Sequence, residues 1–410
     1  MSIELFFPGP RSQRWLRVGS LARDLDGFAA ELAAQGYARQ TAGNKLRLVR
    51  HLSVWLESEG LGAEALDEGR FETFLLTRGP RRVPQGEAAT GRQLLSHLRY
   101  EGRIPEAHKD TDSADAVSRI ERIYERFLVE ERGLSPLTVG KYVPAVRAFL
   151  DERFGARAVA LETLVARDAN RFIVRHAVSR SHAKGLATAM RSFLRHLHQR
   201  GDIAVDLAGA IPSTNWRSPE LPKSLLPEKV ESVLASCDRN TAVGRRDHAI
   251  LLLLARLGLR GGEVATLTLD DLDWDKGLVT IAGKGQRCEA LPLPEEVGRA
   301  LVAYLRDGRP PCATRRVFVR AIAPYRGFRS SMAICDIVRR ALSRVGIDAP
   351  LKGAHLLRRS LACAMLRNGA SLEEIGQILR HRHPETTQIY AKLDLEALRA
   401  LAPAWPGGAS

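Results

Sequence analysis

Apolar residues recur at helical spacing in three segments of the second half of the chain, residues 249–257, 332–345 and 356–366. This spacing places apolar side chains on one face of a helix. Between the first two segments, residues 272–291 contain the β-branched run Val279-Thr280-Ile281 and then the turn-forming Gly283-Lys284-Gly285. We therefore predict a mainly α-helical chain with a small antiparallel β-sheet, which includes a hairpin, in its last part.

A capping box and a proline define two short helices near the C-terminus. Ser371 and Glu374 have the S-x-x-E spacing that caps a helix. The apolar residues that follow predict a helix that ends close to His381. Pro384 suits the first turn of a further short helix. The sequence therefore places Tyr390 on a short helix near an end of the fold.

Two polar stretches rich in proline, glycine or acidic residues divide the chain. They are residues 106–113 and 211–227, and such breaks are typical of domain boundaries. We predict an N-terminal helical extension (residues 1–110), a second helical domain (114–210), a linker (211–225) and a C-terminal domain (226–410).

The first two blocks contain one sequence pattern twice. Residues Gly36, Thr41, Gly43, Val49 and Arg50 have counterparts at the same offset in Gly133, Thr138, Gly140, Val146 and Arg147. In each copy a turn precedes a segment with apolar residues at helical spacing. The pattern predicts a duplicated helical module.

The charge of the chain indicates the class of partner. The formal net charge is +15 at pH 7, and a surplus of this size typically serves polyanions or an acidic membrane surface. Nucleic acid is the first candidate, and a merely soluble basic protein is the alternative.

Cysteine placement and hydropathy give expectations about location and metals. The five cysteines contain no C-x-x-C pair, so we expect neither a zinc site nor a disulfide framework, and a reducing cytoplasm fits best. The longest apolar run, residues 249–254, is far shorter than a membrane span. We expect a cytoplasmic protein that is not anchored in a membrane and not exported.

Basic residues on the predicted helices of the first two blocks are candidates for contacts with DNA phosphates. A solvated helix face is the alternative for any single one of them, and only their clustering favours DNA. The candidates are Arg39, Lys45, Arg47, Arg50, Lys141, Arg147, Lys184, Arg191 and Arg195.

Several polar residues of the last block have the spacing of a site. His355 and Arg358 stand three apart at the start of a predicted helix, so both side chains leave the same face. Arg260 lies where a helix gives way to glycines, with Glu263 nearby to orient it. Lys284 stands between two glycines at the predicted hairpin tip.

Four stretches of this block resemble the catalytic motifs of tyrosine recombinases, the phage integrase family, in order and in spacing. The stretches are GLRGGEV (258–264), GKGQRCEALPL (283–293), HLLRRS (355–360) and LRHRHPETTQIY (379–390). The second block resembles the helical core-binding domain of that family, and the first block matches more loosely, as a DNA-binding extension.

The resemblance implies a role for each matching residue. Arg260 and Arg358 match the two catalytic arginines, Lys284 the hairpin lysine, His355 and His381 the motif histidines, and Tyr390 the nucleophile. It also implies double-stranded DNA as the partner and a homotetramer or hetero-tetramer of recombinases on that DNA.

These roles agree with the chemistry of phosphodiester transfer. Two guanidiniums can clamp the extra negative charge on the equatorial oxygens of the transition state. The leaving 5′-hydroxyl needs a proton, with Lys284 as the first candidate and His355 as the second. Covalent attack by Tyr390 conserves the bond energy in a phosphotyrosyl link, so we expect no metal, nucleotide or other cofactor.

One position departs from the family pattern, because Arg380 stands where the family usually has glycine before the histidine. This arginine raises a question about the backbone of that turn and about the activity level. His383 is an alternative to His381, although the spacing to Tyr390 favours His381. The main hypothesis is a site-specific recombinase or integrase; the alternatives are a type IB topoisomerase-like cleaver and a DNA-binding accessory protein without catalysis.

Overall fold

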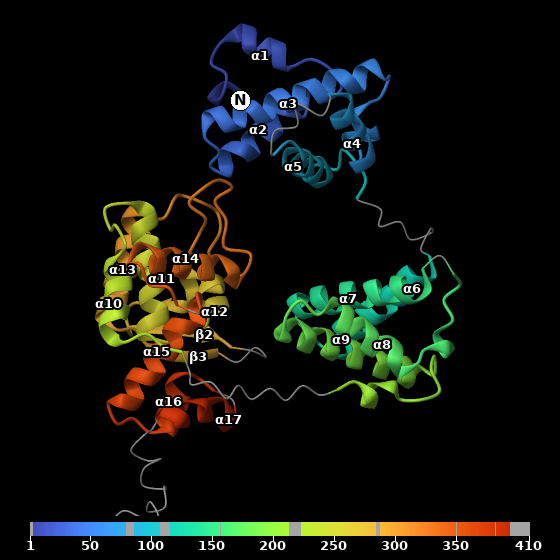
Figure 1. The fold of residues 1–410 in the computed structure, drawn as a ribbon. Coiled ribbons are helices and arrows are strands. Elements are labelled where there is room, and N and C mark those ends of the chain that lie inside the picture. Colours follow the sequence, from blue (N-terminus) through green and yellow to red (C-terminus); the bar gives the residue numbers. More distant parts are fainter. Residues whose placement is uncertain are drawn as a thin grey trace, which may run out of the picture. The chain divides into compact units, whose positions relative to one another are not determined.

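The computed structural model is mainly helical and carries one small antiparallel sheet, as the sequence predicts (Figure 1). Two compact units are present, Glu106–Ser218 and the unit that combines Met1–Pro105 with Pro219–Ser410. The structure describes residues 3–78, 86–106, 115–155, 157–212, 223–283, 288–349, 351–381 and 383–393.

The N-terminal residues form helices around an apolar core of their own. Helix α3 carries the longest buried face of this part, with Leu46, Val49, Leu52 and Leu56 at 2% exposure or less. Their spacing of three to four residues puts them on one side of the helix. The helices are α1 (Pro10–Leu16), α2 (Leu25–Ala34), α3 (Arg39–Ser58), α4 (Glu68–Thr77) and α5 (Glu87–Tyr100).

The unit Glu106–Ser218 is also helical and has a separate core. Ser135 caps its long helix α7, with Pro136 in the first turn. Tyr124, Phe149 and Phe193 are fully or almost fully buried between the helices. The elements are α6 (Ala116–Arg126), a π-helical turn (Phe127–Glu131), α7 (Pro136–Phe154), α8 (Ala166–His176) and α9 (Arg180–Arg200).

The two copies of the predicted module share their local geometry. Gly36 and Gly133 have φ of 78° and 56°, and each lies in the turn before a long helix, α3 or α7. Glycine adopts this left-handed conformation without steric cost. Val49 and Val146, which match in the repeat, are both buried in these helices. The predicted duplication therefore corresponds to two similar turn-helix elements.

The C-terminal part is built around helix α11, whose residues 249–254 are completely buried. The apolar run had predicted a helix over 249–257, but α11 begins seven residues earlier, because Thr241 Oγ1 accepts from the Gly244 N–H at 3.0 Å and caps a polar first turn. The surrounding helices are α10 (Pro227–Ala235), α11 (Ala242–Arg256), α12 (Gly261–Thr266), α13 (Glu295–Asp307), α14 (Ser331–Arg344) and α15 (Ala354–Arg367).

The predicted sheet is present with strand order β1-β2-β3, all antiparallel. Its strands are β1 (Leu272–Asp273), β2 (Leu278–Ala282) and β3 (Cys288–Pro292). Ala282 pairs with Cys288, so β2 and β3 form a hairpin that brackets residues 283–287. Lys284 at the predicted tip lies outside the described residues.

The last described elements form a small cluster beneath α15 (Figure 1). The capping box is confirmed, since the Ser371 N–H donates to Glu374 Oε2 at 2.7 Å and the Glu374 N–H donates to Ser371 Oγ at 3.2 Å. Helix α16 (Leu372–Ile378) ends just before His381, as predicted. After α17 (Pro384–Thr387), Tyr390 lies in a 3-10 helix, Gln388–Leu393.

Candidate active site

Arg260 is held at the start of α12 by a carboxylate three residues later. Glu263 accepts from the Arg260 main-chain N–H at 2.8 Å and from Arg260 Nη1 at 2.7 Å. Burial opposes ionisation of Glu263, but the hydrogen bond from the Arg260 N–H and the charges of Arg380 and Arg260 hold its pKa below the usual value. The Arg260 side chain is 39% exposed, so it is fixed in direction and still accessible to a ligand.

Arg358 is buried in α15 and is held by main-chain oxygens. Its Nη1 donates to the Gly258 carbonyl and its Nη2 to the Leu379 carbonyl. Gly258 has φ of 58°, a conformation that glycine supplies at the turn before Arg260. Burial, followed by the charges of Arg260 and Arg380, lowers the pKa of Arg358 to about 10, and it remains a cation at pH 7.

The turn after α16 contacts both arginines. Besides the Leu379 carbonyl on Arg358, the Arg380 carbonyl accepts from Arg260 Nη2 at 3.2 Å. The carbonyls at a helix C-terminus carry partial negative charge and attract cations. This turn therefore connects the motif of Arg260, about 120 residues upstream, with the motif of Arg358, about 20 residues upstream.

Arg380 keeps the backbone conformation of the turn, although the family usually has glycine at this position. It adopts φ of 54° and is the one non-glycine with positive φ among the described residues. The left-handed conformation costs an L-residue roughly 1–2 kcal/mol. The turn thus keeps the geometry that glycine favours, and the side chain of Arg380 is 5% exposed, with Nη2 2.7 Å from Glu263 Oε2.

The two motif histidines lie beside these cations, and both have lowered pKa values. Burial, followed by Arg358, Arg260 and Arg380, lowers the pKa of His381 to about 4. Desolvation, followed by Arg358, Arg359 and Arg260, lowers the pKa of His355. His381 Nδ1 is 2.7 Å from Thr387 Oγ1. Both imidazoles are therefore mainly neutral at pH 7.

A hollow of about 550 Å³ collects most of these groups. We call it the active-site hollow. His383, the alternative to His381, also borders it as an exposed residue before α17. Other lining residues are Arg260, Glu263, Gly283, Glu289, His355, Arg380, His381 and Thr386. Lys284 follows the lining residue Gly283, and its own position is not described.

Tyr390 lies in the apolar cluster formed with α15 and α16, which also includes Leu379. It is 2% exposed and packs with Cys363, Ile375 and Leu379. Burial, followed by Cys363, raises the pKa of the phenol, while Arg359 and Arg358 oppose this rise. The hydroxyl is therefore protonated at pH 7 and largely shielded from water.

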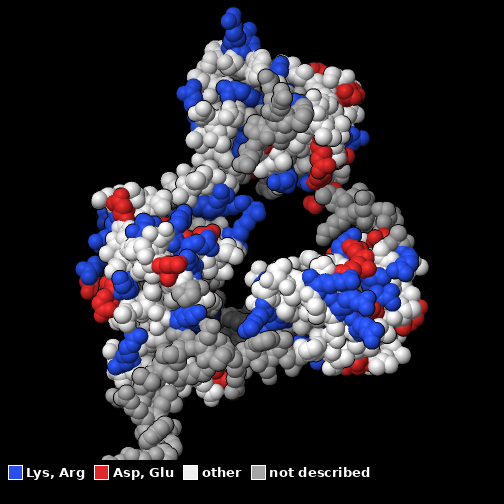
Figure 2. Space-filling model, viewed as in Figure 1, with Lys and Arg blue, Asp and Glu red and all other residues white. Residues whose placement is uncertain are grey.

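Six of the nine predicted DNA-contacting cations take part in contacts within the chain. Lys45 donates hydrogen bonds to the side chains of Thr90 and Gln93, and Arg191 donates one to the Pro212 carbonyl. The guanidinium of Arg50 lies 4.4 Å from the centre of the Trp15 ring. Arg147 forms an ion pair with Glu121 at 2.6 Å. Arg39 donates to the Phe6 carbonyl, and Arg47 to Asn44, from exposed positions. Lys141, Lys184 and Arg195 are exposed and form no ion pair within the described residues. In Figure 2 lysine and arginine side chains are spread over each part of the chain.

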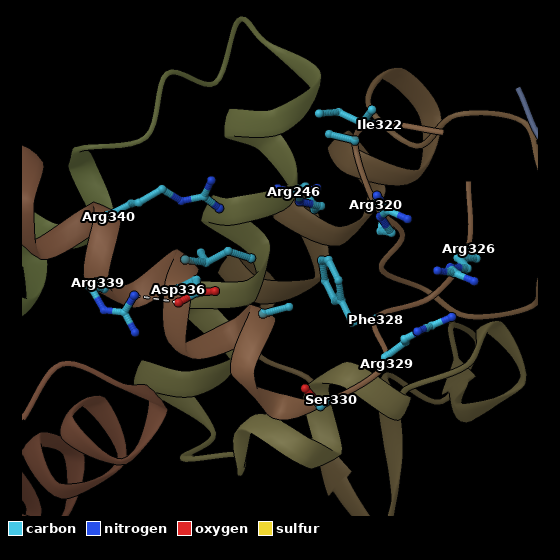
Figure 3. A pocket seen from close by; sticks show the side chains of 13 residues that line it. Arg246, Arg320, Ile322, Arg326, Phe328, Arg329, Ser330, Asp336, Arg339 and Arg340 are labelled. Carbon is cyan, nitrogen blue, oxygen red and sulfur yellow. Dashed lines mark ion pairs between the residues drawn. The ribbon is translucent and has the colours of Figure 1, made fainter. Parts of the chain in front are cut away.

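The sequence did not predict a second cationic hollow, which we call the arginine hollow. Its volume is about 750 Å³, and Arg320, Arg326 and Arg329 lie along one of its sides (Figure 3). Arg246 and Arg339 are paired with Asp247 and Asp336. In the described part of the chain, Arg320, Arg326, Arg329 and Arg340 form no ion pair.

A signal for the arginine hollow exists in the sequence, because no acidic residue stands between Asp307 and Asp336. The two hollows are adjacent in the chain: Ser330 lines the arginine hollow and Ser331 the active-site hollow. The irregular spacing of these arginines on a loop gives no periodic pattern, so only the missing acidic residues could have indicated them.

The described residues contain no group of three His, Cys, Asp or Glu side chains placed to hold a metal ion. None of the described helices combines the length and the apolar character needed to cross a membrane.

Comparison with known proteins gives matches over most of the chain. The sequence profile of the phage integrase family matches residues 223–396. The protein y4rA of Sinorhizobium fredii (strain NBRC 101917 / NGR234), whose name describes an integrase/recombinase, is 45% identical over 386 residues, which cover 93% of this chain and 94% of y4rA. Tyrosine recombinase XerD of Listeria monocytogenes serotype 4b (strain F2365) is 31% identical over 271 residues, 64% of this chain and 90% of XerD.

A solved structure has a similar fold. The crystal structure of the XerH site-specific recombinase, bound to a palindromic difH substrate in a post-cleavage complex, has a TM-score of 0.56 and 18% sequence identity. The similarity covers 82% of this chain and 94% of the XerH chain.

Proposed function

Because the chain belongs to the phage integrase family and is a site-specific tyrosine recombinase, we propose that Tyr390 attacks a DNA phosphodiester within the active-site hollow. The convergence of Arg260, Arg358, His355 and His381 beside the Tyr390 cluster is the observation that carries this proposal. The phenol gives up its proton to water or to a neutral imidazole of the site as its oxygen forms a bond to phosphorus. The bond to the 5′-oxygen breaks, that oxygen takes up a proton, and a 3′-phosphotyrosyl link remains.

The two arginines have the properties needed to stabilise the transition state. Arg260 and Arg358 are positioned before DNA arrives, by Glu263 and by main-chain carbonyls, so little reorganisation is needed when negative charge develops. Their planar forks bind phosphate oxygens bidentately and stay charged at any working pH. Neither arginine has to gain or lose a proton during the reaction.

Lys284 is our first candidate for the general acid that protonates the leaving 5′-oxygen. The lowered pKa of His355 leaves that imidazole mainly neutral at pH 7, so a proton on His355 is rarely available. Substrates with a 5′-bridging sulfur separate the candidates, because a thiolate leaves without a proton. We expect K284A to cleave such a substrate nearly as fast as the native protein and H355A to keep its defect. The reverse pattern would assign the acid to His355.

Cleavage also requires the nucleophile to become accessible. Attack needs the Tyr390 oxygen within about 3–3.5 Å of phosphorus, whereas the side chain is 2% exposed. We therefore propose that the 384–393 segment shifts when DNA binds. The single apolar cluster that it shares with α15 and α16 is small, which supports this step.

The separate apolar cores support three domains, residues 1–110, 114–210 and 226–410, with a linker at 211–225. We propose that double-stranded DNA is the partner and that Lys141, Lys184 and Arg195 contact its phosphates from the second domain, because they are exposed and carry no ion pair among the described residues. A tetramer of recombinases on two DNA sites, acting in the cytoplasm, completes the proposal.

One experiment tests the central step. Purified native protein and its Tyr390→Phe variant are incubated without metal with nicked suicide duplexes from the flanks of its own gene, and a denaturation-resistant protein–DNA adduct is measured. We expect the native protein to form the adduct and Y390F to form none while it binds DNA nearly unchanged. Tight binding by both without any adduct would support the accessory-protein alternative and reject the proposal.

A further inference from the structure

Arg380 brings a second guanidinium to the lining of the active-site hollow, next to Arg260, while the guanidinium of Arg358 is buried and held by the turn at Leu379. Arg380 lines the hollow together with Arg260, His355 and His381. A glycine would adopt the φ of 54° at this turn without strain. Nothing in the backbone therefore requires an arginine here, and the contribution of this residue has to lie in its side chain.

The side chain of Arg380 is buried but incompletely satisfied. It is 5% exposed; Nη2 lies 2.7 Å from Glu263 Oε2, and Nε lies 3.9 Å from Glu289 Oε2. Its Nη1 is buried and has no hydrogen-bond acceptor. A buried donor without an acceptor is unfavourable and marks a place where a ligand atom would be stabilised.

The charges of the site are also unbalanced. Arg260 and Arg380 share the buried carboxylate of Glu263, while Arg358 contacts main-chain carbonyls. The Glu289 side chain is 53% exposed and so offsets the excess only weakly. Three guanidiniums with one buried carboxylate leave an excess of positive charge that an entering phosphate would neutralise.

A purely positioning role for Arg380 is less well supported. Glu263 already orients Arg260 through two hydrogen bonds, at 2.8 and 2.7 Å, and the Arg380 carbonyl, which any residue supplies, adds a third contact. The guanidinium of Arg380 is not needed to hold Arg260 in place, and a positioning role would leave its Nη1 unexplained.

We propose that Arg380 is a third phosphate-binding catalytic residue, whose Nη1 donates a hydrogen bond to a non-bridging oxygen of the scissile phosphate. This assignment rests on the proposed function. No proton is transferred to or from Arg380; it stabilises the charge that grows as the Tyr390 oxygen bonds to phosphorus and the 5′-oxygen leaves. Glu263 holds one end of its guanidinium and the phosphate binds the other.

The test compares a charged with a neutral scissile phosphate. Single-turnover adduct formation is measured for native protein, R380G and R380K on nicked duplexes with either a phosphodiester or a methylphosphonate at the mapped cleavage position. On the phosphodiester we expect R380G to be roughly 30- to 100-fold slower than native and R380K to be intermediate. On the methylphosphonate, which lacks the negative oxygen, R380G should fall within about threefold of native.

Two controls isolate the phosphate contact. R367A removes an exposed arginine of α15 and should change both rates less than about twofold. Thermal unfolding monitors folding, and R380G should stay folded because glycine suits the turn. In a Y390F background, where cleavage is absent, R380G should reduce the preference for the phosphodiester duplex over the methylphosphonate duplex.

The outcomes are distinct. If the native protein and R380G cleave the phosphodiester equally fast, the assignment of Arg380 is overturned and the proposed function stands. The same holds if R380G is slower than native by the same factor on both substrates while the preference for the phosphodiester duplex is unchanged. If native protein forms no adduct, the proposed function fails and the assignment fails with it.

Discussion

At the candidate active site, a carboxylate and a main-chain carbonyl hold Arg260, and main-chain carbonyls hold Arg358. In the arginine hollow, Arg326 and Arg329 form no ion pair with any described residue. A cation that is fixed before DNA binds can stabilise negative charge that develops at one atom. An unpaired, exposed cation is suited to attracting the DNA backbone, whose phosphates all carry the same charge. The comparison therefore predicts that the fixed arginines serve the chemistry and that the unpaired arginines attract DNA.

Replacement of the most rigidly held cation should have the largest effect. We expect R358M to slow adduct formation by about 10³-fold, since it removes a preorganised donor to the transition state. It should also lower the free energy of unfolding, because it leaves the Gly258 and Leu379 carbonyls without their donor.

The matched control for this prediction is R367M, at the exposed last residue of the same helix α15. Cleavage by R367M should remain near native. If R358M cleaves within tenfold of the native rate, the buried guanidinium of Arg358 does not stabilise the transition state and the prediction is wrong.

Removal of the unpaired cations should change binding and leave chemistry intact. We expect the double variant R326Q/R329Q to bind DNA roughly 10- to 100-fold more weakly and to reduce the slope of log affinity against log salt by about 2. The rate of adduct formation at saturating protein should be unchanged. Fluorescence anisotropy at several salt concentrations measures the first effect, and an unchanged salt slope would contradict this role for the arginine hollow.

The burial of His381 and the cations beside it should also make stability depend on pH. The pKa of His381 is lowered from an ordinary value near 6.5 to about 4 in the folded state. Because the unfolded chain binds the proton more readily, this contribution is complete above about pH 6.5 and is lost as pH falls from there toward 4. Discounted for the partial exposure of His381, we expect H381N to reduce the difference in unfolding free energy between pH 7 and pH 4.5 by about 1–2 kcal/mol.

Urea unfolding of the native protein and of H381N at both pH values checks this prediction. The difference between the two proteins isolates His381, since other histidines such as His355 and His248 also have lowered pKa values. Parallel pH dependence in the two proteins would mean that burial and the arginines do not lower the pKa of His381.

The smallest effect is expected from the helix that carries the Leu379 turn. S371A removes the cap of α16 and should lower the free energy of unfolding by about 1 kcal/mol. Cleavage should change less than about twofold, because the cap lies at the opposite end of α16 from the turn. A large loss of cleavage with little loss of stability would show that the position of the turn depends on the whole helix.

Local rules predicted those parts of the molecule that short stretches of sequence determine. The capping box at Ser371, the end of α16 near His381 and the β2-β3 hairpin all follow from spacing and turn chemistry, and all are present. His355 and Arg358 were expected on one helical face, and α15 carries both. The roles assigned to them, and to Lys284, stay predictions.

Contacts between distant segments could not be predicted. The partners of Arg358 are carbonyls at residues 258 and 379, and neither the identity of Gly258 nor that of Leu379 specifies such a contact. The burial of Arg380 beside Glu263 is equally a result of tertiary packing. The arginine hollow combines α11, α14 and the loop between α13 and α14, and a linear pattern does not bring these segments together.

The carbonyl oxygens of Leu379 and Arg380 have a consequence for how this enzyme can vary. Every amino acid supplies the same oxygen, so truncating either side chain would leave these two contacts intact, and a conventional alanine scan would not detect them. Loss or gain of a single residue between α16 and His381 would instead displace both oxygens at once. These two contacts should therefore survive changes of residue type far better than changes of length, and the length of the segment is what preserves them when this recombinase is redesigned.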